Sequence, residues 1–501
     1  MKKLHKWPSL FIAVFILLWA VSGIILNHRH TFSSCDVNRE LLPAEYHYKN
    51  WNNAAIRGSV PIDSSKVLFY GNAGVWQFNN KDEQWTDLRK GLPPGADHHK
   101  INCLLQTKNK QLFAGTRFGL YYFNQTDSSW LARHIPHHDQ HVVDLLETDD
   151  SLLVMTRSHL WKISLEEESA FNYVKIQAPK GYDNKVGLFK TLWVIHSGEI
   201  YGLAGKLLVD AIAVIFIFLT LTGLIYFFFP RITRRRKKKG KKVRRLVSWS
   251  RWSFKWHHKF GIWVAIILIV SPLTGIFLRP PLLIAIASGR VEKIPYSSLD
   301  DGNPWHDQLR RIIYYEEHGS ILLATSEGIF GTDPGFKEAP EYITPQPPAS
   351  VMGYNVFTEH DSGDILVGSF SGIYTWNYNE GNIRDYLTGQ TYIKPQGAVN
   401  PISKNLISGF YVDADGHEYL FDYNRGAISH DHAGAFPAMP EEISEVRMPL
   451  WNVAQEMHTA RLFKPFLGDF YILFIPLFGL SALLILISGV ILWIRKYNRS
   501  H

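Results

Sequence analysis

Four long apolar runs constrain this chain more than any other feature of its sequence. They cover residues 8–26, 207–229, 261–278 and 470–493. A helix needs roughly 20 apolar residues to cross the hydrocarbon core of a bilayer, so each run is a candidate span. The mean hydropathy of the whole chain is only −0.09. The residues between the runs are therefore polar enough to form folded domains outside the membrane.

Histidines precede the runs in an order that occurs twice. His5 and His196 stand before the first two runs, and His257 and His458 stand before the last two. Each run ends on a small residue followed by glycine: Ser22-Gly23, Thr222-Gly223, Thr274-Gly275 and Ser488-Gly489. The repeated order of histidine, helix, large insert, histidine, helix indicates an internal duplication. The small pairs either let helices pack closely or make room for a flat ring.

Most of the excess positive charge lies in one segment. Residues 231–245 carry eleven Lys or Arg and no acid, whereas the whole chain has a formal charge of +8. A nucleic-acid partner is not expected, because this segment lies directly between two apolar runs, where positive-inside bias explains it. Both termini and this segment are then cytoplasmic, and the two large inserts lie on the outer side of the membrane. The first run is expected to be retained, because its duplicate lies in mid-chain where no signal peptide occurs.

The two large inserts have a strand-rich pattern that repeats about every forty residues. Apolar strands alternate with glycine turns and aromatic strand ends, at 67–78, 112–123, 152–163, 321–330, 365–376 and, more weakly, 409–423. Units of this length and composition are typical of propeller blades. About three units on each side predict one β-propeller closed from two halves, which would leave no unpaired sheet edge. Two separate β-sandwiches are the alternative.

The expected fold is a membrane protein of the α + β class, with four transmembrane helices built as a duplicated two-helix unit. A periplasmic propeller-like domain is formed by the two inserted segments. The expected boundaries are helix 1 at 1–27, first periplasmic segment 28–195, helix 2 at 196–230, basic cytoplasmic loop 231–256, helix 3 at 257–279, second periplasmic segment 280–457, and helix 4 with a cytoplasmic tail at 458–501. Pro272 is expected to kink the third helix.

Cysteine chemistry is limited to two residues, Cys35 and Cys103. They are either two thiols or one disulfide, and their spacing does not decide between these. The sequence contains no CxxC or CxxCH motif. Covalently attached c-type haem and cysteine-ligated zinc or iron–sulfur sites of the usual spacing are thereby excluded.

The histidines near the span ends divide by membrane side. The inner group is His5, His257 and His258, and the outer group is His28, His30, His196 and His458. A lone histidine near a span end is most often an interfacial residue. Equivalent histidines of a duplicated helix pair, however, point into one shared space, and neutral imidazole is a common ligand of iron. We therefore expect axial ligands for two haems, one near each face of the membrane.

The expected ligands are His5 and His257 for an inner haem, and His196 and His458 for an outer one. His28 is the first substitute at the outer face, His258 is the substitute at the inner face, and His30 is a weaker outer candidate. These seven residues are the predicted cofactor-binding set, with the first four as the axial ligands.

The four spans and their approaches resemble the PepSY-associated transmembrane-helix family of bacterial inner membranes, which includes ferric-siderophore reductases. The similar segments are LHKW…SGIIL at 4–26, IHSGEIYGLAGKLL…LTGLIYFFFPR at 195–231, WHHKFGIW…LTGIFL at 256–278, and MHTARLF…ISGVILWIRK at 457–496. The resemblance implies a haem-binding four-helix core that moves electrons from cytoplasm to periplasm. The propeller-like repeats, in contrast, stand in place of a clear PepSY domain.

The expected function is that of a membrane-bound b-type haem protein that reduces a periplasmic ferric chelate, such as a ferric siderophore, in iron uptake. No GxGxxG follows a strand, and the segment 231–256 is too short for a flavin or nucleotide domain. Electrons must therefore come from a cytoplasmic donor or a quinol. The alternative is a membrane-anchored propeller that senses a signal or binds an assembly partner without redox activity.

Overall fold

A computed structural model describes the chain except residues 166–169, 351–352, 361, 395–402, 431–433 and 498–501. The last of these gaps is the end of the expected cytoplasmic tail, which lies outside the described residues. The chain divides into two compact units. The helical unit contains Met1–Phe32, Asn184–Asp301 and Leu450–His501, and the β unit contains Ser33–Asp183 and Gly302–Pro449.

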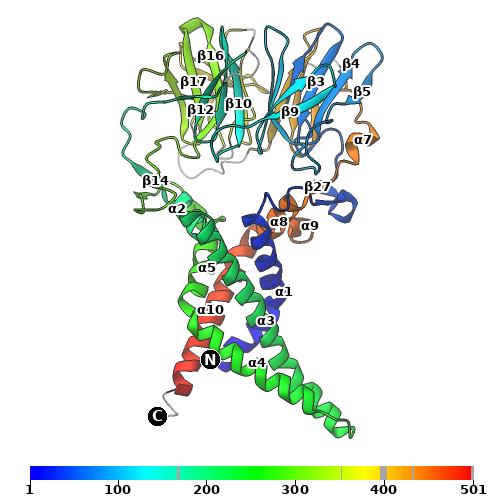
Figure 1. The fold of residues 1–501 in the computed structure, drawn as a ribbon, viewed down its shortest axis with the longest axis vertical. Helices are drawn as coiled ribbons and strands as arrows, with labels where there is room; N and C mark the ends of the chain where they lie inside the picture. The colour runs from blue at the N-terminus through cyan, green and yellow to red at the C-terminus, as the bar shows by residue number, and fades with distance from the viewer. Residues whose placement is uncertain (166–169, 351–352, 361, 395–402, 431–433, 498–501) are drawn as a thin grey trace. The chain divides into compact units, whose positions relative to one another are not determined.

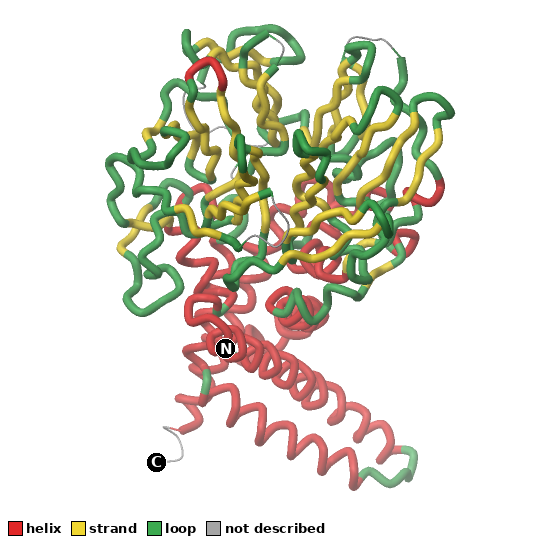
Figure 2. The backbone as a smooth tube through the Cα atoms, turned by 45° about the horizontal axis from the view of Figure 1, so that its top comes forward, coloured by secondary structure: helices red, strands yellow, loops and turns green. Residues whose placement is uncertain are grey.

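The β unit consists of small antiparallel sheets whose strands follow one another in chain order (Figures 1 and 2). Sheets 1 to 3 come from the first insert. They are β2 (Gly58–Pro61), β3 (Lys66–Gly71), β4 (Gly74–Asn79) and β5 (Gln84–Asp87); β6 (Ile101–Gln106), β7 (Leu112–Thr116), β8 (Leu120–Asn124) and β9 (Ser129–Arg133); and β10 (Val142–Glu147), β11 (Ser151–Thr156), β12 (Leu160–Ser164) and β13 (Asn172–Val174).

Sheets 4 to 6 come from the second insert. They are β16 (Leu309–Tyr315), β17 (Ser320–Thr325), β18 (Gly328–Thr332) and β19 (Glu341–Tyr342); β20 (Val356–Glu359), β21 (Ile365–Ser369), β22 (Gly372–Asn377) and β23 (Asn382–Asp385); and the three-stranded sheet β24 (Ile407–Val412), β25 (Glu418–Asp422) and β26 (Gly426–Ser429). Gly74 and Gly372 begin third strands with φ angles of 111° and 117°, which suit glycine.

The six sheets pack in a ring, because a separate apolar core fills each junction between consecutive sheets. The core that closes the ring joins Phe69 and Trp76 of sheet 1 to Tyr411 and Phe421 of sheet 6. The second strands are covered on both faces, so all six residues of β11 are buried. This arrangement is propeller-like, with three sheets from each insert. Both cysteines are free thiols, Cys35 exposed and Cys103 buried.

Short elements join the ends of the inserts. In the β unit, β1 (Asp36–Val37) pairs with β27 (Met448–Pro449), and α7 (Glu441–Ser444) precedes β27. In the helical unit, β14 (Lys185–Gly187) pairs with β15 (Arg290–Glu292). Each pairing joins chain segments that are far apart in the sequence.

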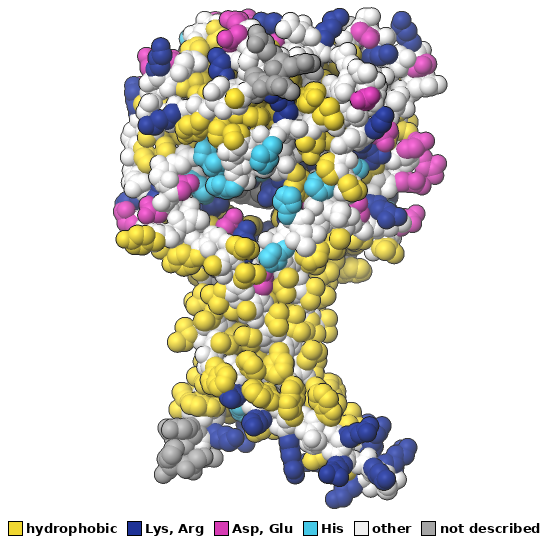
Figure 3. Space-filling view, in the orientation of Figure 1, with side chains coloured by type: hydrophobic (Ala, Val, Ile, Leu, Met, Phe, Trp, Pro, Cys, Tyr) yellow, Lys and Arg dark blue, Asp and Glu magenta, His cyan; other side chains and the backbone are white. Residues whose placement is uncertain are grey.

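The helical unit is built around α1 (Lys2–Asn27), α3 (Gly202–Lys238), α4 (Arg244–Trp263), α5 (Ala265–Phe277) and α10 (Tyr471–Tyr497). The shorter helices are α2 (Leu188–Ser197), α6 (Leu282–Ile286), α8 (Leu450–His458) and α9 (Lys464–Leu467). Among the residues that the structure describes, three helices are long and apolar enough to cross a membrane, or up to four if the bent pair α4 and α5 is one span. Apolar side chains cover their outer surface, and Lys and Arg gather at the α3–α4 end (Figure 3).

The helix boundaries differ from expectation in three respects. The basic segment 231–256 is mostly helical, because α3 continues to Lys238 and α4 begins at Arg244. The third span bends by 70° at the break between α4 and α5, whereas Pro272 lies inside α5. His196 and His458 end the separate short helices α2 and α8, because the chain turns into the left-handed region at Gly198 and at Ala460.

Candidate functional site

Two histidines from different helices lie close together at one end of the helical unit. The ring centroids of His5, near the start of α1, and His257, in α4, are 6.3 Å apart with an interplanar angle of 82°. The Nδ1 atom of His5 is 2.9 Å from the Ile485 carbonyl oxygen and 3.3 Å from Ser488 Oγ. The Nδ1 atom of His257 is 3.0 Å from Thr222 Oγ1. Each ring is thus held by a different helix, α10 or α3.

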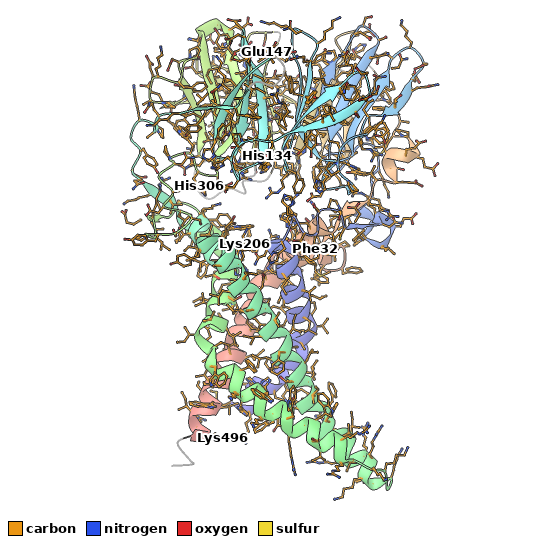
Figure 4. The ribbon with its side chains drawn as sticks, viewed as in Figure 1. Phe32, His134, Glu147, Lys206, His306 and Lys496 are labelled. Carbon is orange, nitrogen blue, oxygen red and sulfur yellow. The ribbon has the colours of Figure 1, made fainter. Side chains whose placement is uncertain are left out.

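A second histidine pair has the same construction. The rings of His196 and His458 have centroids 6.1 Å apart and an interplanar angle of 58°. The Nδ1 atom of His196 is 3.1 Å from both the Ser271 carbonyl oxygen and Thr274 Oγ1 of α5. The Nδ1 atom of His458 is 3.0 Å from Ser22 Oγ of α1. The two pairs lie apart along α1, because His5 is near its start and Ser22, the partner of His458, is near its end. Lys206 and Lys496, which Figure 4 labels, lie toward the two ends of the long helices.

The hydrogen bonds at Nδ1 fix the tautomers of the rings. The carbonyl oxygens that contact His5 and His196 can only accept, so Nδ1 of these rings carries the proton. The hydroxyls of Thr222 and Ser22 donate to main-chain carbonyls of their own helices, which leaves their oxygens as acceptors for His257 and His458. All four Nε2 atoms therefore keep a lone pair, and within the described parts of the chain no hydrogen bond occupies it.

A glycine underlies each of the four rings. A Cβ atom placed on Gly275 would lie 2.9 Å from Cε1 of His196, and one on Gly489 would lie 3.1 Å from Cε1 of His5. The corresponding distances are 3.4 Å from Gly223 to His257 and 3.5 Å from Gly23 to His458. Each small pair identified in the sequence therefore holds one histidine: its hydroxyl accepts a hydrogen bond from Nδ1, and its glycine leaves space for the ring. We call each such Ser/Thr–Gly pair the seat of its histidine.

The four contacts follow the duplicated order of the chain. The histidine of α1 is seated on α10, and its counterpart in α4 is seated on α3. Likewise, the histidine of α2 is seated on α5, and its counterpart in α8 is seated on α1. Exchange of the two halves maps each contact onto another. The arrangement thus has the two-fold relationship that a duplicated helix pair predicts.

The spacing within each pair suits one metal ion shared by two Nε2 atoms. A metal–imidazole bond is about 2 Å long and the nitrogen lies about 1 Å from its ring centre, so two opposed ligands place their centroids about 6 Å apart. The observed separations are 6.3 and 6.1 Å. No cluster of three or more metal-ligating side chains occurs among the described residues. Among the described residues each pair thus offers two imidazoles, a donor set that suits a group which brings its other ligands itself, such as haem.

The substitute candidates have other environments. The Nε2 atom of His28 lies 2.5 Å from the Asp210 carboxylate, and Asn27 donates to the other carboxylate oxygen at 3.0 Å. His258 packs edge-on against Phe254, with ring centroids 4.3 Å apart. His30 lies in the turn that follows α1. The four principal candidates are brought together in two pairs from different helices. His258 also lies near His257, with ring centroids 6.5 Å apart, but both belong to α4. His28 contacts Asp210, the acid that interrupts the second apolar run.

The sequence indicated the small pairs but not their role as hydrogen-bond partners. Nothing in it identified the carbonyl groups of Ser271 and Ile485, because main-chain acceptors leave no pattern. The fixed order of hydroxyl then glycine was the available signal for Ser22 and Thr274. Serine and threonine are common in packed membrane helices for other reasons, so the signal becomes specific only with the histidine geometry.

Comparison with known proteins gives one match that extends over nearly the whole chain. A family model described as the PepSY-associated TM region matches residues 2–496. No curated protein matches the sequence at a significant level.

The similar solved structures are distant from this chain in sequence. One, described as the extracellular domain of a hybrid two component system, BT4673, from B. thetaiotaomicron, has 10% identity and a TM-score of 0.37, with 75% of this chain and 32% of that chain covered. Virginiamycin B lyase from Staphylococcus aureus has 8% identity and a TM-score of 0.37, with 82% and 89% covered. PorZ from Porphyromonas gingivalis has 10% identity and a TM-score of 0.34, with 74% and 38% covered.

The chain thus spans about a third of the length of the first of these structures. Likenesses of this size assign no function, and the ring of sheets is established by its own packing.

Proposed function

The chain belongs to the PepSY-associated transmembrane family, and we propose that it is a b-type haem protein that carries electrons across a bacterial inner membrane to a periplasmic ferric chelate. The observation that carries this proposal is the pairing of four histidines, each with Nδ1 committed to a seat and Nε2 available. His5 and His257 would hold an inner haem, and His196 and His458 an outer one.

The four seats position the imidazole rings as ligands. A hydrogen bond to the distal ring nitrogen fixes the tautomer and orientation of a metal-binding imidazole and raises its basicity. Bound haem would supply one-electron chemistry between ferric and ferrous iron. On α1, His5 itself and Ser22, the partner of His458, are separated by 17 residues of helix, or about 25 Å. Two sites at this separation divide the membrane thickness between them.

Reduction of a ferric chelate is the proposed outcome because ferric iron prefers hard oxygen ligands and ferrous iron binds them less tightly. The electron donor is a cytoplasmic protein or a quinol. The proposed topology has four spans, with α4 and α5 forming one bent span and both termini cytoplasmic. It follows from the basic α3–α4 end, which positive-inside bias would keep in the cytoplasm. Reporter fusions at Lys239 and Asp149 should report cytoplasm and periplasm respectively; the opposite pattern would exclude this topology.

The haem assignment is tested on the purified full chain. We expect a Soret band and about two haems per chain, with His5→Ala and His196→Ala each losing about half the haem and nearly all transmembrane electron transfer. His30→Ala is the matched control, since His30 belongs to neither pair, and it should keep both haems. A folded, colourless protein would reject the proposal and favour a propeller that senses or binds a partner without redox activity.

A further inference from the structure

Two arginines lie next to the His196–His458 pair. Arg279 follows α5, one helical turn beyond the Thr274-Gly275 seat of His196, and its guanidinium donates to the main-chain carbonyl of Thr459 at 3.1 Å. Thr459 is the residue after His458. Arg279 therefore links α5, which holds the seat of His196, to the segment that follows His458.

Arg461 adds a second positive charge at the same place. It donates to the Glu456 carboxylate at 2.5 Å, and its Nε atom is buried without a hydrogen-bond partner in the described structure. Arg279 and Arg461 also repel one another electrostatically. Arg279 and Arg461 bring two guanidinium groups to this place and Glu456 brings one carboxylate, so the formal charges of these three residues sum to +1.

Arg279 stays charged despite its surroundings. Burial, followed by the nearby Arg461, lowers its pKa to about 10, which is still well above neutral pH. The first half of the chain has no equivalent charge: the segment SGIILN ends on Asn27 where the matching TGIFLR ends on Arg279. The duplication is therefore broken at this position: a cation follows the Thr274-Gly275 seat of His196, and an uncharged residue follows the Ser22-Gly23 seat of His458.

We propose that Arg279 and Arg461 form a carboxylate-binding site beside the His196–His458 pair, which takes the propionate groups of the haem held there. This inference rests on the proposed function, since it names residues that would fix the edge of the outer haem. Arginine suits the role because its planar guanidinium forms paired hydrogen bonds with carboxylates. The phosphate of a lipid headgroup is the other source of an anion at a membrane surface, and the experiment separates the two.

The test compares two ligands in two forms of the full chain. Apoprotein of the wild type and of Arg279→Gln is loaded with protohaem or with protohaem dimethyl ester, which has no propionate charge. Haem release to excess apomyoglobin is then followed. We expect one of the two release phases of protohaem to accelerate about tenfold or more in Arg279→Gln, as loss of a charge-assisted hydrogen bond predicts. Release of the dimethyl ester should not change, and Arg279→Lys should restore part of the loss.

A second readout is the propionate bending mode in the resonance Raman spectrum, which should shift in Arg279→Gln and in Arg461→Gln. Arg29→Gln is the matched control: Arg29 lies in the same unit and stacks on Trp451, 3.8 Å from the ring centroid. If Arg279→Gln accelerates the release of protohaem and of the ester equally, Arg279 only supports the fold or binds a lipid phosphate. If it changes the release of neither ligand, the inference is also wrong. A wild type without haem would instead reject the proposed function.

Discussion

The ring of His196 rests directly on Gly275, where an added Cβ atom would come within 2.9 Å of Cε1. The Nδ1 atom of His196 also lies 3.1 Å from the hydroxyl oxygen of Thr274, the residue before Gly275. One helical turn of α5 thus both orients the ring and limits what can stand beneath it.

Gly275→Val should displace His196 and remove about half of the haem. The clash involves the ring itself, so relief of the clash would move Nε2 of His196 away from His458. Gly261→Ala is the control, because its Cβ atom would meet only Leu219 Cδ2 at 3.9 Å and alanine favours helix. Haem content by the pyridine haemochromogen assay distinguishes them. Full haem in Gly275→Val would mean that His196 is not a ligand.

The His28–Asp210 pair is predicted to stabilise the helices without binding haem. Removal of His28 leaves the Asp210 carboxylate, which lies in an apolar run, with the Asn27 amide and without its contact to the imidazole, and a lost partner is expensive inside a membrane. His28→Ala should therefore lower the thermal midpoint of the full chain in detergent while both haems remain, and His28→Ala with Asp210→Asn should recover part of the loss. Loss of one haem in His28→Ala would instead make His28 an axial ligand.

A buried ion pair joins sheets 3 and 4 of the propeller-like unit. Arg311 contacts the Asp144 carboxylate at 3.0 Å, and their side chains are only 12% and 11% exposed. Asp144→Asn should destabilise the chain by about 3–5 kcal/mol, because it leaves a buried guanidinium without its anion. Glu341→Gln, which breaks the exposed Lys180 pair, should cost less than about 1 kcal/mol. Denaturant unfolding of both variants provides the comparison.

His99 should make the β unit less stable in mild acid. Burial, aided by Arg89, lowers the pKa of His99 to about 4 from the ordinary 6.5. Between these two pH values the imidazole of His99 is protonated in the unfolded chain and neutral in the folded chain. The free energy of unfolding therefore falls as pH drops from about 6.5 toward 4. After allowance for solvent screening, about 1 kcal/mol is expected. Thermal midpoints of the wild type and His99→Gln should converge as pH is lowered; parallel curves would contradict the assignment.

The sequence predicted the middle of each sheet better than its edges. The paired runs at 67–78 and 365–376 became β3 with β4 and β21 with β22, because these central strands are apolar and joined by a glycine. The outer strand β5 was missed, since it is mostly exposed and short and carries no apolar alternation. Ring closure also depends on contacts such as Phe69 with Tyr411, which no local pattern encodes.

The candidate site was predictable as a set of residues and not as a geometry. Duplication singled out His5, His257, His196 and His458, and the structure brings them together in two pairs. Which histidine meets which small pair depends on how the helices cross. The partner of His28 was equally inaccessible, because Asp210 is 182 positions away in the chain.

The packing of sheet 1 against sheet 6 has a consequence for biosynthesis. The amide of Asn53, just before sheet 1, donates to the carbonyl of Tyr423, just after β25, at 2.7 Å, so the sheet that covers sheet 1 is made about 370 residues later. At about 5–20 residues per second, the ribosome takes roughly 20–70 s to supply it. During that interval the first three sheets emerge with an apolar face of sheet 1 uncovered, and a chaperone that recognises exposed apolar surface can act then.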